Sequence, residues 1–295
     1  MGVIGVLGGS GVYELEGLEE ARWERVASPF GTPSDAILRG CLEGVEYAFL
    51  PRHGRGHRLP PGAIDYRANV DALKRIGVTD LISVSACGSL RADLAPGAFV
   101  LVDQFVDRTF AREKSFFGAG CVAHVSMADP VCARLQEALE ASARAAGIRV
   151  VRGGTYLAME GPQFSSRAES ELYRSWGCDV IGMTNMPEAK LAREAEICYA
   201  SVAMVTDYDC WHPEETAVQV RDIVAVLTDN GERGRRLVAG LAKELAGRPE
   251  PCAGGCDRAL DSALITPPEA RDPEMLARLD AVAGRVLGSP MEDRS

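Results

Sequence analysis

Short apolar runs alternate with amphipathic segments along most of this 295-residue chain, and this alternation limits its fold more than any other feature. The candidate strands are residues 3–8, 46–51, 80–86, 98–106, 150–159, 178–184 and 198–207. The segments with helical spacing are residues 65–77, 129–147, 165–177, 186–197 and 214–246. Strands that alternate with helices are typical of proteins in which helices cover a central sheet. We therefore expect an α/β fold with one core domain over residues 1–246.

The pattern changes after residue 246. The segment "GRPEPCAGGC" (247–256) is typical of a linker, and residues 257–288 contain patterns for short helices that pack back on the core. We expect the last residues, "GSPMEDRS", to be disordered, as chain ends often are. Within the core, Asp129 is the expected N-cap of the helix in 129–147, with Pro130 at its first position.

The charge of the chain limits its partners. The formal net charge is -10, which disfavours a non-specific grip on nucleic acid or on an anionic membrane. No run approaches the roughly 20 apolar residues that a membrane-spanning helix needs. The N-terminal "MGVIGVLGGSG" lacks the basic start of a signal peptide, so we expect a cytoplasmic protein.

Nine cysteines are scattered along the chain, and several lie in apolar runs where a thiol behaves as a small hydrophobe. Cys252 and Cys256 have three residues between them, and the chain has only four histidines, so the spacing does not favour a zinc site. We expect no metal site. Free thiols are the default in a reducing cytosol, although a local or inter-subunit disulfide stays open.

Two loops near the N-terminus are candidates for binding an anion. The glycine-rich "GVLGGSGVY" (5–13) follows a strand and contains Ser10, and such a turn either presents N–H groups to an anion or is simply a tight turn. The loop "PRHGRGHRLPP" (51–61) holds Arg52, His53 and His57 and is the densest basic stretch of an acidic chain. A solvated loop is the alternative, but the guanidinium fork matches an oxyanion, so we favour an anion site.

Three further stretches place small or hydroxyl-bearing residues after strands. In "SACGSLRADLAPG" (85–97), Ser85 and its neighbours can bring N–H groups to an anion, and a nucleophilic Cys87 is the weaker alternative. In "GMTNMPEA" (182–189), Thr184 can bind an anion, and Met183 either covers a sugar or belongs to the core. In "AMEGPQFSSRAE" (158–169), Phe164 either stacks on a flat ring or is core.

Two aspartates end the last apolar run, in "TDYDCWHP" (206–213). Ligands of open α/β sheets bind at the carboxyl ends of strands, so we expect Asp207 and Asp209 to lie in a pocket with the other strand-end loops. An aspartate there can accept from an exocyclic amine or hold a proton for a ring nitrogen. A role as helix N-cap is the alternative, and it suits Asp209 better than Asp207.

These stretches, in this order, resemble the trimeric purine nucleoside phosphorylase family, and within it most closely the 5'-methylthioadenosine phosphorylases. The matching motifs are "GGSG", "RHGRGH", "DYRANVDALK", "ACGSLR", "DQFVDRT", "EGPQFSSRAES", "GMTNMPEA" and "VTDYDCW", and they extend from residue 3 to about residue 266. The resemblance implies a single-domain phosphorylase fold with a central mixed β-sheet flanked by helices. Asp207 and Asp209 match the members that act on 6-aminopurines, whereas members that prefer 6-oxopurines have an asparagine after this strand.

The resemblance also implies a reaction and its residues. Phosphate would attack C1' of S-methyl-5'-thioadenosine, giving adenine and 5-methylthioribose 1-phosphate. Phosphate would be bound by Ser10, Arg52, His53, Ser85, Ala86 and Thr184. The nucleoside would contact Met183 at the ribose, Phe164 and Ser165 at the base, and His57 and Val220 at the 5' side. Asp207 and Asp209 would serve the purine N7 and the 6-amino group, and paired carboxylates can raise one pKa enough to supply a proton.

The family needs no cofactor, because phosphate is a co-substrate, and its members form trimers, sometimes paired into hexamers. His124 is the candidate for a residue that completes a neighbour's pocket. The partners we expect are therefore a nucleoside, phosphate and further copies of this chain, with no nucleic acid and no membrane. Alternatives are a phosphorylase for adenosine, methylthioinosine or another purine nucleoside, or a catalytically silent nucleoside-binding module.

Overall fold

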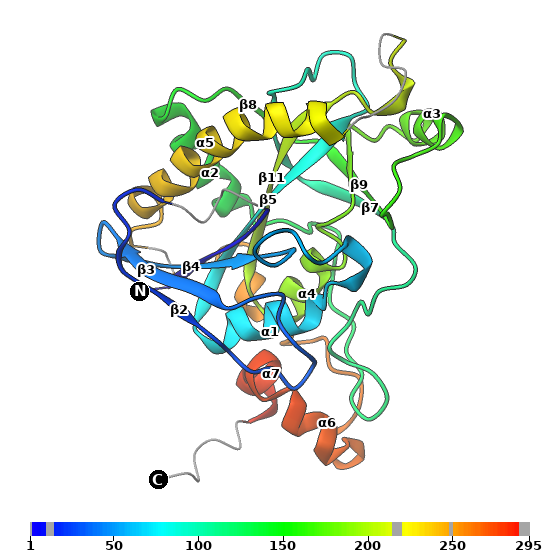
Figure 1. The fold of residues 1–295 in the computed structure, drawn as a ribbon. Helices are drawn as coiled ribbons and strands as arrows, with labels where there is room; N and C mark the ends of the chain where they lie inside the picture. Colours follow the sequence, from blue (N-terminus) through cyan, green and yellow to red (C-terminus); the bar gives the residue numbers. More distant parts are fainter. Residues whose placement is uncertain (1, 10–14, 214–219, 248–249, 289–295) are drawn as a thin grey trace.

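The computed structural model describes residues 2–9, 15–213, 220–247 and 250–288, and for residues 220–225 it describes the backbone only. One mixed sheet forms the centre (Figure 1), as the sequence predicted. Its strands are β1 (Val3–Gly8), β2 (Glu19–Glu24), β3 (Ile37–Leu42), β4 (Val45–Pro51), β5 (Val78–Ser89), β6 (Phe99–Val102), β7 (Gln104–Arg108), β8 (Val150–Arg152), β9 (Thr155–Met159), β10 (Val180–Gly182) and β11 (Cys198–Asp207).

The sheet divides along β5, its longest strand. On one edge of β5, β1 runs parallel to it from Val3↔Val78 to Gly8↔Val84. Farther along β5, β10 pairs antiparallel with Gly88 and Ser89. The other edge pairs with β11, in parallel, as far as Gly88. Since β11 occupies that edge, β1 and β10 share the opposite one, and residues 85–87 face no strand of the described sheet there. This opening between β1 and β10 is called the fork below.

Helices cover both faces of the sheet (Figure 1). They are α1 (Tyr66–Arg75), α2 (Ala133–Ala145), α3 (Arg167–Ser175), α4 (Glu188–Glu194), α5 (Val220–Glu244), α6 (Pro273–Arg278) and α7 (Asp280–Leu287). The apolar run of β11 shows how one strand serves both faces. Tyr199 and Ala203 pack in the cluster that contains Leu73 of α1, whereas Val202 and Met204 pack in the cluster of α2 and α5. A strand covered on both faces reads as a continuous apolar run, which is why the sequence predicted β11 to the residue.

Two predicted strands are each divided in the structure. The run 98–106 becomes β6 and β7, and the run 150–159 becomes β8 and β9. Both breaks lie at one contact, where the N–H groups of Asp103 and Gln104 donate to the carbonyl of Gly154. Gly153 and Gly154 both have positive φ, at 85° and 138°, which ends a regular strand. The exposed strand β2 and its neighbour β3 were missed, because β2 lacks an apolar run.

Side chains cap the N-termini of α1 and α3 but not that of α2. Asp65 caps α1 by accepting from the N–H of Ala68 at 3.0 Å, and Ser166 forms a capping box with Glu169. The prediction of Asp129 as N-cap of α2 is wrong, because the helix begins at Ala133 and Cys132 occupies the N-cap position without a side-chain cap. The Cys132 thiol is therefore left for other contacts.

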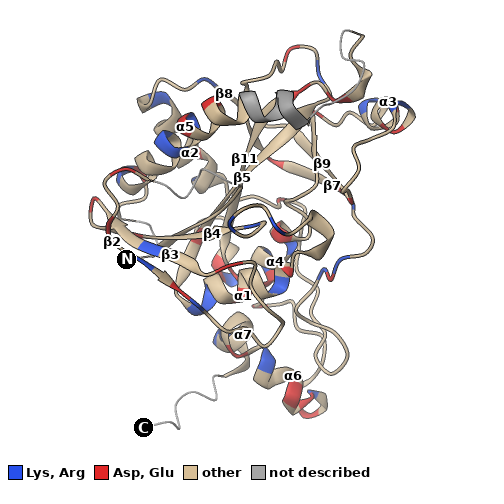
Figure 2. Cartoon of the chain, viewed as in Figure 1, with Lys and Arg blue, Asp and Glu red and all other residues tan. Residues whose placement is uncertain are grey.

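The C-terminal helices lie at the foot of the molecule in Figure 1, where α7 packs on α1. Arg75 of α1 forms an ion pair with Asp280 of α7, and Arg285 pairs with Glu196 at 2.6 Å. The division into a core of 1–246 and a tail stays a prediction, and the tail end expected to be disordered, residues 289–295, lies outside the described residues. No helix in the described ranges is long and apolar enough to cross a membrane. Charged residues of both signs lie mainly on the outer helices and loops (Figure 2).

Candidate active site

The loops that follow β1, β4, β10 and β11 come together around the fork. Gly8 of β1 pairs with Pro51 of β4 and with Val84 of β5, so the chain after each of these residues enters the same region. Parallel strands end at one edge of a sheet, and in folds of this kind that edge is where ligands bind.

Arg52 follows β4 and is almost completely buried, with 1% of its surface exposed. Its Nε donates to Glu188 at 2.8 Å, and its Nη2 donates to the Leu7 carbonyl at 3.0 Å. Nη1 donates to the Val84 carbonyl, so at most one of the five N–H groups remains for a ligand. Burial lowers the pKa of Arg52, but the Glu188 carboxylate more than offsets this and raises it. The sequence analysis assigned this guanidinium group to an anion, but in the structure it is paired with the Glu188 carboxylate.

His53 lies beside this ion pair. Its Nδ1 is 2.9 Å from the Leu59 carbonyl, which can only accept, so Nδ1 carries the proton and Nε2 is the acceptor. Burial and the neighbouring Arg52 charge lower the pKa of His53 to about 4, so the ring is neutral at neutral pH. The rings of His53 and His57 stack, with centroids 4.2 Å apart. The loop therefore offers a ligand neutral donors and acceptors rather than a cluster of free cations.

Ser85 and Thr184 line the fork from opposite sides, on β5 and after β10, and both are buried. The Ser85 hydroxyl has no well-formed hydrogen bond among the described residues, nor does the hydroxyl of the buried Tyr156. Burial raises the pKa of Tyr156 to about 12, although the nearby Thr184 and Ser85 hydroxyls oppose this. Ala86 is next to Ser85, at the part of β5 that faces no strand on this edge. Unpaired buried hydroxyls beside open backbone are suited to bind the oxygens of an anion.

Asp207 ends β11 and lies against β5. A Cβ placed on Gly88 would be 2.9 Å from Asp207 Oδ1, so only glycine leaves room for the carboxylate there. Asp207 Oδ1 accepts from the Asp209 N–H at 2.8 Å, and Oδ2 accepts from the Thr206 hydroxyl at 2.7 Å. Asp209 is 3% exposed, and its backbone has φ 54°, a left-handed conformation that L-residues rarely adopt. Asp209 begins a short 3₁₀ helix, Asp209–Trp211, and the start of the helix that it was the alternative candidate to cap lies outside the described residues.

The candidate base and sugar residues lie on the segment after β9 and next to it. Phe164 is 44% exposed, which makes a core role untenable and leaves a ring available for stacking. The carbonyl of Ser165 accepts from the Cys210 thiol at 3.3 Å, which ties this segment to the chain after Asp209. Met183 lies against Gly161, where a Cβ would be 2.5 Å from its sulfur.

Arg112 is a residue of this site that the sequence did not indicate. Its guanidinium donates to the carbonyls of Met183 at 2.7 Å, Met186 at 2.8 Å and Glu160 at 2.6 Å. The Glu160 carboxylate in turn accepts from Nε of Arg112 and from the Phe110 N–H. One buried arginine thus holds together the loops that carry Met183 and Phe164. No local motif marks such a residue, because its partners are backbone carbonyls far away in the chain.

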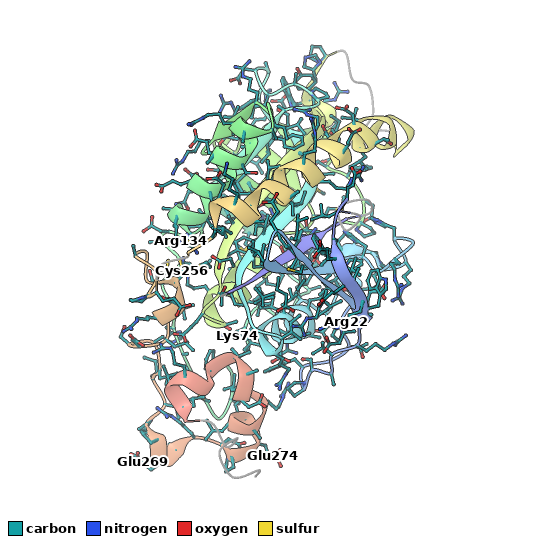
Figure 3. All side chains as sticks on the ribbon, turned by 90° about the vertical axis from the view of Figure 1, so that its left-hand side faces the viewer. Arg22, Lys74, Arg134, Cys256, Glu269 and Glu274 are labelled. Atoms are coloured by element: carbon teal, nitrogen blue, oxygen red, sulfur yellow. The ribbon has the colours of Figure 1, made fainter. Side chains whose placement is uncertain are left out.

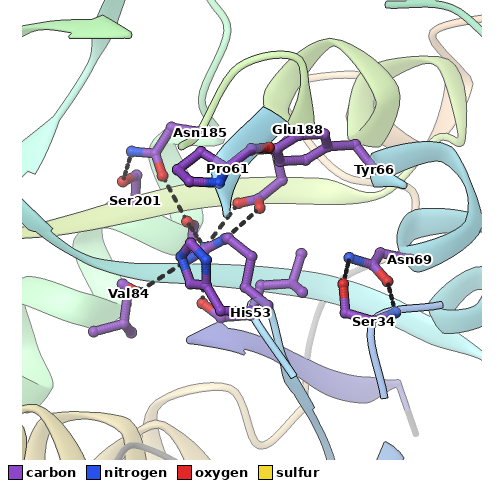
Figure 4. Close-up of polar contacts among 12 residues, drawn as sticks. Ser34, His53, Pro61, Tyr66, Asn69, Val84, Asn185, Glu188 and Ser201 are labelled. Carbon is purple, nitrogen blue, oxygen red and sulfur yellow. Dashed lines mark hydrogen bonds and ion pairs between the residues drawn. The ribbon is translucent and has the colours of Figure 1, made fainter. Parts of the chain in front are cut away.

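A buried polar network lies beneath the fork (Figure 4). Glu188 accepts from Arg52 and from the Tyr199 hydroxyl, at 3.0 Å for the latter. Asn185 is fully buried with φ 70°; it accepts from Ser83 at 2.8 Å and donates to Ser201 at 2.7 Å. Asn185 therefore joins β5 and β11 to the segment after β10 through side-chain hydrogen bonds. Its left-handed backbone, like those of His57 and Asp209, marks strain at the site.

Other predicted residues lie outside the described part or away from the fork. Ser10 falls in the range 10–14, and Val220 is described only by its backbone, at the start of α5. His124 is exposed, and its N–H donates to the Ala263 carbonyl at 2.9 Å. With Lys114 and Glu194 it lines a second, shallow cavity of about 390 Å³.

Comparison with known proteins identifies the family of this chain. Residues 3–243 match the family model of the phosphorylase superfamily. The S-methyl-5'-thioadenosine phosphorylase of Cereibacter sphaeroides is 66% identical over 285 residues, which are 97% of this chain and 98% of that protein. A methylthioadenosine phosphorylase from an antarctic soil metagenomic library superimposes with a TM-score of 0.89 at 46% identity, covering 95% of this chain and 98% of that one. The methylthioadenosine phosphorylase of Schistosoma mansoni in complex with adenine gives 0.83 at 36% identity, covering 88% and 98%.

Proposed function

The chain belongs to the phosphorylase superfamily, and from this we infer that it is a pentosyltransferase that cleaves S-methyl-5'-thioadenosine with inorganic phosphate. The products are adenine and 5-methylthioribose 1-phosphate. One phosphate oxygen forms a bond to C1' while the bond from C1' to N9 of the purine breaks. The electron pair of that bond leaves with the purine, which takes up a proton at N7. Phosphate is a co-substrate, and the reaction as written uses no cofactor.

The observation that carries this inference is the position of Asp207 beside the fork. Its carboxylate contacts residue 88 of β5, three residues beyond Ser85, so a purine at Asp207 and a phosphate at Ser85 lie on one strand end. The Asp207 carboxyl, when protonated, is the donor we propose for N7, and Asp209 the acceptor for the 6-amino group.

The phosphate subsite we propose consists of Ser10, Arg52, His53, Ser85, Ala86 and Thr184. The buried hydroxyl of Ser85 supports this assignment, because a phosphate oxygen would satisfy it, and Thr184 is buried beside the same opening. Arg52 has mainly a structural role: it donates to the Glu188 carboxylate and to backbone carbonyls at the ends of β1 and β5. At most one of its N–H groups remains for the ligand. A dianion bound by hydroxyl and N–H groups near an already neutralised arginine is held by dipoles more than by net charge.

The nucleoside subsite we propose has Phe164 and Ser165 at the base, Met183 at the ribose, and His57 and Val220 at the 5' side. The exposed ring of Phe164 and the position of Met183 against Gly161 support the first two roles. An apolar wall at the 5' side suits a thioether and rejects a hydroxyl only modestly. We also propose a homotrimer, alone or paired into a hexamer, in which His124 of one copy completes the pocket of the next. The cytoplasmic location stays a prediction.

A substrate panel tests this function: methylthioadenosine, adenosine, methylthioinosine and inosine, each with and without phosphate. We expect phosphate-dependent release of adenine from methylthioadenosine, with the highest kcat/KM of the four. Faster cleavage of adenosine would assign the enzyme to adenosine, and faster cleavage of methylthioinosine would contradict the role of the aspartates. Base release without phosphate would indicate a hydrolase. Binding without turnover would indicate a nucleoside-binding module.

A further inference from the structure

Four cysteines from three separate segments meet in the core, far from the fork. Cys132 precedes α2, Cys198 begins β11, and Cys252 and Cys256 belong to the segment after α5. Their four sulfur atoms all lie within 4.8 Å of one another, and each residue is at most 3% exposed. The chain has nine cysteines, all in the described residues and none in a disulfide, so nearly half of them gather at one point.

We propose that these four cysteines bind one structural zinc ion as a tetrahedral set of thiolates. Zinc–sulfur bonds of about 2.3 Å place the sulfurs of a tetrahedral site about 3.8 Å apart. The sulfurs of Cys132 and Cys252 are already 3.7 Å apart, and the largest separation of 4.8 Å needs a contraction of about 1 Å. A disulfide between Cys132 and Cys252, at about 2.05 Å, would need a shift of about 1.7 Å, which is larger than the contraction that zinc needs.

A tight turn of the backbone lies directly against two of the sulfurs, those of Cys252 and Cys256. The chain turns between Cys252 and Cys256 through Gly254 and Gly255, and the N–H of Gly255 donates to the Cys252 carbonyl at 2.8 Å. Gly255 has φ 67°, which favours glycine. A Cβ on Gly254 would be 3.8 Å from the Cys256 sulfur and 3.9 Å from that of Cys252, so this turn wraps both sulfurs. One tight turn thus supplies two of the four ligands, and two distant elements supply the other two.

Charge and access also suit a metal. Four thiolates and one Zn²⁺ leave a net charge of about −2, which needs positive groups nearby. The Arg134 guanidinium interacts with the Cys198 sulfur as well as with Asp80, and Cys132 is at the N-terminal end of α2, where the helix dipole favours a negative charge. Cys132 and Cys256 also line a cavity of about 560 Å³, which gives an ion a path from solvent. Figure 3 shows Arg134 and Cys256 on the same side of the molecule.

The site is structural because of where it lies. Cys198 is the first residue of β11 and Asp207 the last, so the cluster and Asp207 are about 30 Å apart along the strand. A zinc ion there would join the segment after α5 to α2 and to the central sheet, and it would stabilise the folded chain by mass action. Spacing in the sequence did not indicate this site, because only Cys252 and Cys256 are near each other in the chain.

The test is the metal content of the full-length protein, expressed with zinc in the medium and freed of loosely bound ions. We expect about one zinc ion per chain by mass spectrometry of the elements, and a lower melting temperature after treatment with a chelator. Cobalt in place of zinc should give the visible absorption of a tetrahedral tetrathiolate. The double variant Cys252→Ser/Cys256→Ser should lose the metal, whereas Cys178→Ser, which alters a buried cysteine outside the cluster, should keep it.

Metal content of the unaltered protein decides the question even if the double variant fails to fold. Less than about one tenth of an equivalent of zinc, with nine free thiols in the denatured chain, would refute the site. Two or four thiols that react with an alkylating agent only after reduction of the denatured chain would indicate one or two disulfides in its place. One equivalent of iron would refute the choice of zinc. None of these outcomes depends on which nucleoside the enzyme cleaves.

Discussion

Replacement of Asp207 by asparagine separates recognition of the purine from stability of the fold. Among the described residues, Asp207 accepts hydrogen bonds from the Asp209 N–H at 2.8 Å and from the Thr206 hydroxyl at 2.7 Å. Asparagine can keep the first through its Oδ1. Its amide then faces Thr206, whose hydroxyl lies 3.1 Å from the Cys87 carbonyl and can donate there while it accepts from the amide. The network is therefore reformed with its direction reversed, and we expect the free energy of unfolding to change by about 1 kcal/mol or less.

The effect on catalysis should be much larger and should depend on the substrate. Asparagine has no acidic proton for N7, and loss of a general acid typically lowers the rate by about 10²- to 10⁴-fold. That range corresponds to about 3–5 kcal/mol of transition-state free energy for methylthioadenosine. With methylthioinosine, the new amide can donate to the purine O6 or N7, so we expect a loss of about tenfold or less. The preference for the 6-amino substrate should therefore fall by at least about tenfold.

The assay compares kcat/KM of the variant Asp207→Asn with that of the unaltered enzyme on both nucleosides at saturating phosphate. Urea unfolding measures the stability of each protein. Asp209→Asn is the matched control, because it also converts one of the paired acids to an amide but should affect mainly the 6-amino contact and KM. An equal loss on both nucleosides, with stability unchanged, would refute the role of Asp207 at the base.

Three further changes test other parts of the structure. Glu188→Gln removes the charge that faces the 1%-exposed Arg52, and an unpaired buried charge should lower the free energy of unfolding by about 3–5 kcal/mol in urea titrations. Burial raises the pKa of Glu194 from 4.5 to about 7, so between these pH values the folded state holds a proton that the unfolded state releases. The free energy of unfolding should therefore fall by up to about 3 kcal/mol as pH rises from 4.5 to 7. Glu194→Gln should remove this fall, as melting at pH 5 and pH 8 would show. Gly161→Ala, at φ 70°, places a Cβ 2.5 Å from the Met183 sulfur and should raise KM for the nucleoside.

Each of these changes has its own control. Glu171→Gln alters an exposed acid of α3 and should leave the urea midpoint nearly unchanged; an equally small effect of Glu188→Gln would contradict the role of its ion pair with Arg52. A melting profile that falls with pH as steeply in Glu194→Gln as in the unaltered protein would assign that slope to another group. Gly147→Ala has a similar φ of 68° but no atom within 4 Å of the new Cβ, so a matching rise in KM would exclude the contact with Met183 as the cause.

The sequence by itself determined the class of fold and the order of the site motifs. The apolar run of β11 depends on neighbouring residues, so periodicity predicts it. Asp207 was assigned to a pocket for the same kind of reason, since it directly follows a buried strand and strand ends carry ligands. The recurring motifs then indicated the family, which the comparison with known proteins confirmed.

Only the tertiary structure decided which distant groups meet. The fork depends on β1 and β10 sharing one edge of β5, and strand pairing of this kind has no local signature. The partner of Arg52 is Glu188, more than a hundred residues away in the chain. Because the sequence does not show this pairing, it led us to assign the Arg52 guanidinium to a ligand, whereas the group is hydrogen-bonded within the protein. The cysteine cluster has the same origin: its members come from α2, β11 and the segment after α5, and burial on one face of the sheet brings their sulfurs together.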